Sequence, residues 1–150
     1  MAERRVVWLS ALALLAGCGA PVQGTARPVE LTDGDRSVLR SYYDDLNKSG
    51  DNGSDQQETK IKETQHPDFR GKACDLRGAT LKIEPTWSTL RMDADWAPPG
   101  EKTHPRGVVY VVAVTVTLRQ EKTVIGSQIG SQHVVLLDGK VYGFAPCVGG

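Results

Sequence analysis

The amino-acid sequence predicts an α+β fold, in which N-terminal helices pack on a curved antiparallel sheet. Apolar residues recur every three or four positions in residues 38–46, which is typical of one face of a helix. From Ala79 the apolar period changes to two, which indicates strands, and the dipeptide Asp138-Gly139 indicates a hairpin turn. Helices that precede antiparallel strands along a chain indicate an α+β domain, and 150 residues suffice for one.

The composition narrows the classes of protein to consider. Eighteen Lys and Arg balance eighteen Asp and Glu, so no overall positive field attracts nucleic acid. A hydrophobic share of 39% and a mean hydropathy of −0.32 argue against a polytopic membrane protein and against a wholly disordered chain. The sequence contains no phosphate-binding loop, dinucleotide fingerprint or metal motif, so we expect no cofactor and no metal.

Residues 1–17 have the pattern of a secretory signal peptide. Arg4 and Arg5 provide the positive start, and an apolar run over residues 6–16 follows, interrupted only by Ser10. Such a run rises about 16 Å as a helix, well short of the ~30 Å hydrocarbon core of a bilayer. We therefore expect a signal that is cleaved and not a permanent membrane span.

The tetrad Leu15-Ala16-Gly17-Cys18 resembles the lipobox of bacterial lipoproteins. This resemblance implies that Cys18 carries an S-linked diacylglycerol, becomes the first residue after cleavage and receives an N-linked palmitoyl chain. Two or more acyl chains anchor a protein stably, whereas one chain binds only reversibly. We expect a protein anchored by lipid at the extracytoplasmic face of the cell membrane; the alternative is an ordinary secreted protein with a chance cysteine at its cleavage site.

The other two cysteines, Cys74 and Cys147, are expected to form a disulfide in an oxidising compartment. A metal site is less favoured because no Cys-x-x-Cys or Cys/His pair has ligand spacing. Residues 18–32, rich in Gly and Pro, predict a flexible tether after the lipidated cysteine. The folded domain is expected over residues 33–150.

Two helices are expected at the start of this domain. The first begins near Thr32 or Asp33, ends within residues 47–54, and carries an apolar stripe of Val38, Leu39, Tyr42, Tyr43 and Leu46. The second, over about residues 55–64, contains good helix formers but only Ile61 as a residue to bury.

Strands occupy the rest of the chain. An alternating segment from Ala79 to Trp96 changes parity near Trp87, which predicts a β-bulge or turn and a bend in the sheet. After a loop over residues 97–107, the strongest strand covers residues 108–118, and another ends at Leu137. The hairpin turn then predicts three cross-strand pairs: Leu137 with Lys140, Val135 with Tyr142, and His133 with Phe144.

A family resemblance rests on several of these segments together. The run His66-Pro67-Asp68-Phe69-Arg70, then Cys74, the strand over residues 109–117, Asp138-Gly139-Lys140 and Cys147 are similar to actinobacterial membrane lipoproteins with an NTF2-like domain. The resemblance implies a cone of helices packed in the concavity of a bent sheet. That fold hosts both enzymes and binding modules.

The cone is expected either to be filled by side chains or to form an apolar pocket for a hydrophobic small molecule. A third alternative is an interaction module that docks another envelope protein or a second copy through the exposed face of its sheet. Trp96 adds to the aromatic surface. The candidate pocket residues are Tyr42, Tyr43, Trp87, Tyr110, His133, Tyr142 and Phe144.

An enzyme is the alternative function. NTF2-like isomerases use an acid and a tyrosine inside the cone, and the corresponding candidates here are Tyr42 or Tyr43 with Asp93, Asp95 or His133. Each has a simpler explanation, because the tyrosines lie on the apolar stripe of a helix and the aspartates alternate with apolar residues on a strand. We therefore assign no catalytic residue and expect a binding or interaction module.

Overall fold

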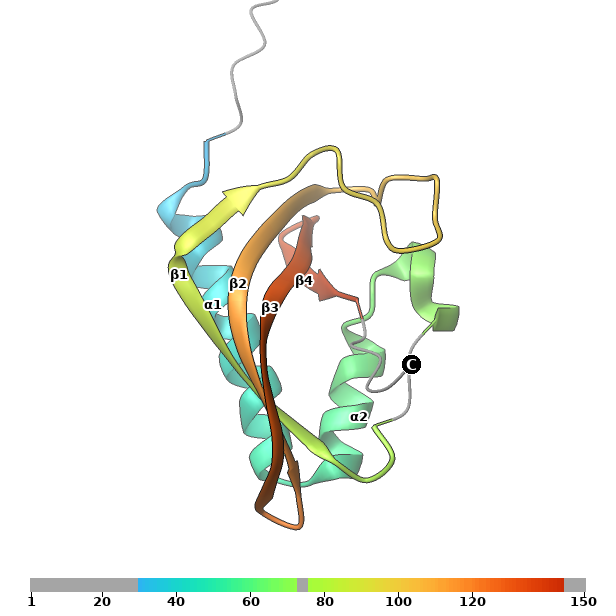
Figure 1. Ribbon diagram of the computed structural model, residues 1–150. Helices are drawn as coiled ribbons and strands as arrows, with labels where there is room; N and C mark the ends of the chain where they lie inside the picture. Colours follow the sequence, from blue (N-terminus) through green and yellow to red (C-terminus); the bar gives the residue numbers. More distant parts are fainter. Residues whose placement is uncertain (1–29, 73–75, 145–150) are drawn as a thin grey trace, which may run out of the picture.

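The computed structural model describes residues 30–72 and 76–144. The predicted signal, Cys18 with most of its tether, and the predicted pair of Cys74 and Cys147 lie outside the described residues. Two helices pack on one antiparallel sheet with the strand order β1-β2-β3-β4, so the α+β class is confirmed (Figure 1).

Helix α1 covers Asp33–Asp51 and begins with a capping box. The Thr32 hydroxyl accepts a hydrogen bond from the Asp35 N–H at 3.0 Å, and the Asp35 carboxylate accepts one from the Thr32 N–H at 3.1 Å. The apolar stripe buries Leu39, Tyr43 and Leu46 as expected. Val38, predicted to share this stripe, is 38% exposed because it lies at the stripe's margin.

Helix α2 covers Ser54–Glu63, and the short 3-10 helix η1 covers Pro67–Lys72. Ile61 is buried, as its position in an otherwise polar helix predicts. Gln57 is buried as well, and the sequence pattern did not reveal this because glutamine is ordinarily a surface residue.

The four strands are β1 (Thr80–Met92), β2 (Val108–Gln120), β3 (Thr123–Leu137) and β4 (Lys140–Gly143). The register between β1 and β2 shifts between Thr86 and Arg91, which confirms the irregularity predicted near Trp87. Figure 1 shows that β1, β2 and β3 are strongly twisted and that α2 lies across from β3.

The hairpin between β3 and β4 turns at Asp138 and Gly139, whose φ angles of 52° and 74° are those of a type I′ turn. The predicted pairs of Leu137 with Lys140 and of Val135 with Tyr142 are confirmed. The predicted pair of His133 with Phe144 is wrong, because the ladder ends at Gly143. The Gly143 N–H and C=O groups bind Thr64 and His66 instead, which draws the chain away from β3.

One face of the sheet, which we call the core face, packs on α1. It carries Leu81 and Ile83 of β1 and the even-numbered residues of β2, of which Tyr110, Val112 and Val114 are fully buried. The alternation of β2 predicted this face. At one end of β2 the opposite face is buried too, at Val109 and Val111.

The outer edge of β1 is closed by two side-chain amides. Gln57 bonds both the N–H and the C=O of Leu81, at 2.7 Å each, and Asn47 does the same for Ile83, at 2.8 Å each. An amide side chain has the same donor and acceptor as a peptide group, so it replaces a neighbouring strand at this edge. The helices thereby satisfy an edge that would otherwise lack partners.

Candidate functional site

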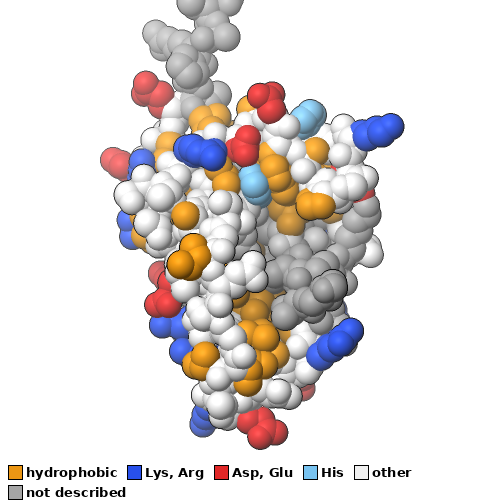
Figure 2. Space-filling view, in the orientation of Figure 1, with side chains coloured by type: hydrophobic (Ala, Val, Ile, Leu, Met, Phe, Trp, Pro, Cys, Tyr) orange, Lys and Arg blue, Asp and Glu red, His pale blue; other side chains and the backbone are white. Residues whose placement is uncertain are grey.

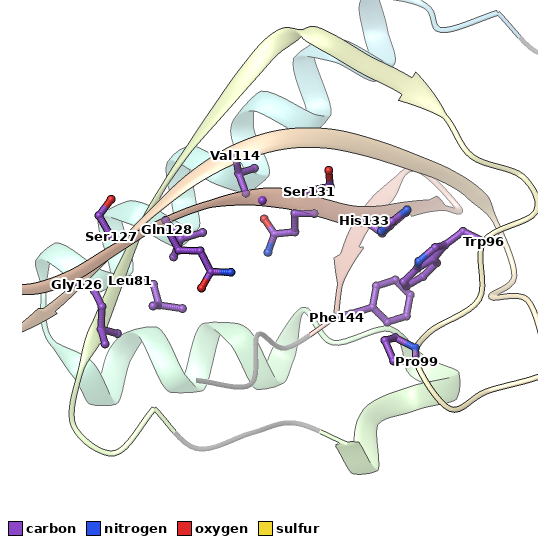
Figure 3. Close-up of a pocket in the computed structure, with 14 residues that line it drawn as sticks. Leu81, Trp96, Pro99, Val114, Gly126, Ser127, Gln128, Ser131, His133 and Phe144 are labelled. Atoms are coloured by element: carbon purple, nitrogen blue, oxygen red, sulfur yellow. The ribbon is translucent and has the colours of Figure 1, made fainter. Parts of the chain in front are cut away.

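A cavity of about 530 Å³ lies beside β3, on the side of the sheet that faces α2 (Figure 3). Its size falls within the range of small-molecule sites. Strands β2 and β3 contribute most of its lining, and Trp96, Pro99 and Phe144 close one end. Figure 2 shows hydrophobic side chains gathered in the hollow on this face, some beside the histidines and some in its lower half.

The apolar part of the lining belongs to the core face. Val114, Val116 and Leu118 of β2 and Leu81 of β1 contribute aliphatic side chains. The β3 residue opposite Val114 is Gly130, and a Cβ atom built there meets nothing within 4 Å. A glycine at this position therefore leaves space that a side chain would otherwise occupy.

The polar part of the lining comes from β3. Gln128 and Gln132 contribute amide groups from the core face, whereas Ser127 and Ser131, which pair with Thr117 and Ala113, border the cavity from the opposite face of the strand. No described residue that lines the cavity is Asp, Glu, Lys or Arg. The side-chain oxygen of Gln132 is buried and has no hydrogen-bond partner among the residues that the structure describes. A buried acceptor of this kind favours a ligand that brings a donor, because leaving it unpaired costs free energy.

The closed end of the cavity is aromatic (Figure 3). The rings of Trp96 and His133 stack with centroids 4.1 Å apart and planes 10° apart, and Phe144 meets Trp96 edge-on at 4.7 Å. The ring of His133 also lies 2.9 Å, from Nε2 to Oδ2, from the carboxylate of Asp93. The aspartate therefore holds the orientation of the imidazole, and the tryptophan covers one of its faces.

His66 supports this end from the interior. It is fully buried, and its ring stacks on Phe144 with planes 9° apart. Nδ1 accepts a hydrogen bond from the Asp68 N–H at 3.2 Å, so Nε2 is assigned the proton that it donates to the carbonyl of Arg106 at 2.9 Å. His66 precedes Pro67 and lies outside both expected helices, and nothing in the sequence indicated that it is buried.

An ion pair joins η1 to the loop before β2. The Arg106 guanidinium donates to both carboxylate oxygens of Asp68, at 3.0 and 2.8 Å. These hydrogen bonds hold the pKa of Asp68 below its ordinary value of 3.8. Together with His66, the pair connects the loop containing Trp96 and Pro99 to the helical layer.

The structure separates the predicted pocket residues into three groups. His133 and Phe144 line the cavity. Tyr42 and Tyr142 border a different hollow, between α1, α2 and β4. The remaining three, Tyr43, Trp87 and Tyr110, belong to the core packed against α1 and are not among the residues that line the cavity, because they lie under the helix.

Three tyrosine hydroxyls, those of Tyr42, Tyr43 and Tyr110, have a raised pKa. Burial raises the pKa of Tyr42 to about 12, and burial together with the nearby carboxylate of Asp35 raises the pKa of Tyr110 to about 12. Burial also raises the pKa of Tyr43, whose hydroxyl has no hydrogen-bond partner within residues 30–72 and 76–144. The predicted combination of a tyrosine with His133 is not assembled here: Tyr43 packs edge-on against Trp87, at 5.7 Å.

The two candidate aspartates, Asp93 and Asp95, differ in their exposure and contacts. Asp95 is exposed, whereas Asp93 lies on the same end of the sheet as His133 and contacts it. Alternation along β1 could not reveal this contact, because it spans three strands. The stacking of the Trp96 ring on His133 was likewise not predictable from the local sequence.

Among the residues that the structure describes, no helix has both the length and the apolar character needed to cross a membrane. Within the same residues, no three His, Cys, Asp or Glu side chains cluster closely enough to hold a metal ion. No protein-family model, no curated protein and no solved structure matches this chain.

Proposed function

We propose that this protein is a lipid-anchored lipoprotein of the cell envelope whose NTF2-like domain binds a neutral amphipathic molecule in the cavity beside β3. The lipobox ending at Cys18 supports the anchor. Two helices packed on a bent four-stranded antiparallel sheet are compatible with the NTF2-like fold. The observation that carries the binding function is the cavity of about 530 Å³ with an apolar floor.

The lining defines the ligand class. Aliphatic side chains of the core face and the Trp96 ring suit an acyl chain or a fused ring, and burial of that part drives binding. The amide groups of Gln128 and Gln132 suit a polar but uncharged group, since no charged side chain lines the cavity in the described part of the chain. A monoacylglycerol has both properties and serves as the probe.

Filling the cavity tests this function. A Cβ atom at Gly130 meets nothing within 4 Å, so we expect the ring of Gly130→Phe to occupy the cavity opposite Val114 and to block the site. Thr115→Phe is the matched control, because Thr115 belongs to the opposite face of β2 and is not among the lining residues. Monoacylglycerol added to the full chain in nonionic detergent is expected to raise the melting temperature of the wild type and of the control, and to leave Gly130→Phe unchanged.

Equal responses of the two variants would show that the probe binds elsewhere, and no response in the wild type would remove the support for this ligand class. Circular dichroism of both variants establishes that the fold is intact. The result does not require the lipid anchor.

A second candidate function, proton transfer, is favoured by one contact. Because Nε2 of His133 faces Asp93, Nδ1 is the nitrogen left to take a proton from a bound ligand. The base would take a proton from the carbon between the carbonyl and the double bond and return it to the far carbon of that double bond. The double bond thereby shifts into conjugation with the carbonyl, and no oxidant is required. Isomerisation of a β,γ-unsaturated cyclic ketone, lost in His133→Gln and reduced in Asp93→Asn, would support it; no turnover by the wild type would contradict it.

A further inference from the structure

The edge of β3 is open over much of its length. Strand β4 pairs only with residues 134–137, so in the described residues the part of β3 from Thr123 to His133 has a partner strand on one side, β2. The opposite edge of the sheet, on β1, is satisfied by Gln57 and Asn47. The backbone groups of Leu81 and Ile83 at the β1 edge therefore have side-chain partners, whereas residues 123–133 of β3 have a partner strand on one side only in the part of the chain that the structure describes.

The groups that face outward at this edge follow from the register. Successive residues of an antiparallel strand direct their N–H and C=O groups to alternate sides. Leu81 and Ile83 direct theirs away from β2, because side-chain amides bind them from outside the sheet. Their partners in β2 therefore direct their N–H and C=O groups toward β3, where they bind the even-numbered residues of that strand. The N–H and C=O groups that point outward from β3 are then those of Ser127, Ile129 and Ser131.

Natural sheets protect such edges with charged side chains, proline or short strands. None of these devices occurs here: no Asp, Glu, Lys, Arg or Pro lies between Thr123 and Leu137. Ile129, in the centre of the open edge, is 81% exposed, more than Val124 or Ile125 on the same strand. Both the backbone groups and an apolar side chain are thus available to a partner strand.

The sequence of the edge is complementary to itself. Gly126-Ser127-Gln128 and Gly130-Ser131-Gln132 repeat on the two sides of Ile129. If a second copy pairs antiparallel about a two-fold axis at Ile129, Ser127 lies opposite Ser131 of the second copy and Gln128 lies opposite its Gly130. Cross-strand hydroxyl pairs stabilise a sheet, and each glutamine finds space over a glycine.

The lack of charged side chains along this edge is compatible with the pairing. Like charges placed directly opposite each other destabilise a strand pair, and an uncharged edge brings none together. An isologous contact about a two-fold axis also closes after two copies, so it forms a dimer and not a fibre.

We propose that two copies of this chain form a dimer by antiparallel pairing of their β3 edges, centred on Ile129. The two sheets become one continuous sheet, and the partner strand lies along the same residues of β3 that line the cavity. This inference goes beyond ligand binding and does not depend on it, because the pairing uses backbone groups that exist with or without a ligand.

Site-directed cross-linking tests the register. At the two-fold axis, the Cα atoms of Ile129 and its symmetry mate are expected about 5.5 Å apart, within the range of a disulfide. Val124 is the matched control: it is on the same strand and 57% exposed, but its mate would lie roughly 30 Å away at about 3.3 Å per residue. Ile129→Cys and Val124→Cys are made in the full chain, oxidised in intact cells with copper phenanthroline, and separated on non-reducing gels.

A disulfide-linked dimer is expected for Ile129→Cys and not for Val124→Cys, with the wild type measuring any dimer formed by the native cysteines. Equal dimer in both variants would indicate random collision and would overturn the proposal. So would a monomer in both, or a cross-link from Ile129→Cys to a different protein only.

A second measurement avoids cysteine. Ile129→Lys places two ammonium groups opposite each other at the axis, whereas Val124→Lys places none. Native mass spectrometry of the detergent-solubilised chain is expected to show a dimer for the wild type and for Val124→Lys, and at least a tenfold smaller dimer fraction for Ile129→Lys. A monomeric wild type contradicts the proposal, even if monoacylglycerol still binds.

Discussion

At the scale of single residues, the most consequential side chain is Gln57. It is fully buried and makes three hydrogen bonds: to the carbonyl of Leu46 in α1, and to both backbone groups of Leu81 in β1. One amide therefore connects both helices to the edge of the sheet. A buried amide is stabilising only when its hydrogen bonds are complete, so this position does not tolerate truncation.

Replacing this glutamine tests the connection. Gln57→Ala leaves the Leu81 N–H and C=O without partners and opens a void, so the free energy of unfolding is expected to fall by about 3 kcal/mol. Gln56→Ala is the matched control, because Gln56, the neighbour of Gln57 in α2, is exposed, and its substitution should change stability by less than about 0.5 kcal/mol. Urea denaturation of both variants measures the difference; equal losses would contradict the role of Gln57.

Tyr43 shows the opposite case, because its buried hydroxyl has no hydrogen-bond partner in the described part of the chain. Tyr43→Phe removes the unpaired oxygen and keeps the ring against Trp87, so the free energy of unfolding is expected to stay the same or to rise by up to about 1 kcal/mol. Tyr110→Phe is the control, since the Tyr110 hydroxyl donates to the Asp35 carboxylate at 3.2 Å and its loss should be destabilising by about 1 kcal/mol. Urea denaturation distinguishes them; a clear loss in Tyr43→Phe would show that its hydroxyl is bonded.

At the scale of elements, the first turn of α1 depends on protonation. The Thr32 N–H, which donates to the carboxylate, lowers the pKa of Asp35 below 3.8, and the Thr32 and Tyr110 hydroxyls act in the same direction. A carboxylate whose pKa is lower in the folded than in the unfolded state stabilises the fold above its unfolded pKa. This contribution is lost as the pH falls through the folded pKa.

A comparison of the wild type with Asp35→Asn isolates this effect. The wild type is expected to be the more stable above pH 3.8, and the difference should shrink as the pH falls below that value. Asp33→Asn is the control: Asp33 lies in the same turn, but Asp35 is the residue that forms the capping box. Urea denaturation at pH values between 7 and 2.5 measures the difference, and a constant difference across this range would exclude the carboxylate as its source.

Local sequence patterns were sufficient to predict some features of the strands. The hairpin at Asp138-Gly139 was predictable with its register, because a two-residue turn with positive φ angles fixes the pairs that flank it. The bend in β1 was predictable because a change of parity requires an extra residue. The end of β4 was not, because a contact with the segment after α2, distant in the chain, determines it.

At the scale of the whole molecule, the chain combines a predicted anchor with a folded domain. If Cys18 is lipidated, mass spectrometry of the protein from a bacterial host with lipoprotein processing is expected to show a chain that begins at Cys18 and carries a diacylglyceryl group and an N-acyl chain. Cys18→Ala should abolish both the cleavage and the added mass. An unmodified thiol, or residues 1–17 still attached in the wild type, would contradict the anchor.

The candidate site was predictable only in part. His133 and Phe144 were expected at a pocket and line the cavity, since aromatic and polar residues near a hairpin are recognisable from the sequence. The placement of Trp96 on His133, the contact of Asp93 with His133 and the burial of His66 were not. Alternation along a strand shows which face a side chain occupies, but it does not show which distant segment covers that face.

The sequence by itself determined the α+β class, the order of the helices and strands, the bend in β1 and the register of the last hairpin, because each depends on local periodicity or turn chemistry. Only the tertiary structure decided that side-chain amides close the edge of β1 at Leu81 and Ile83, that residues 123–133 of β3 pair on one side only within the described part of the chain, and that a cavity lies beside β3. These features depend on how the twist of the sheet brings residues from different elements together, and that arrangement is a property of the packed chain.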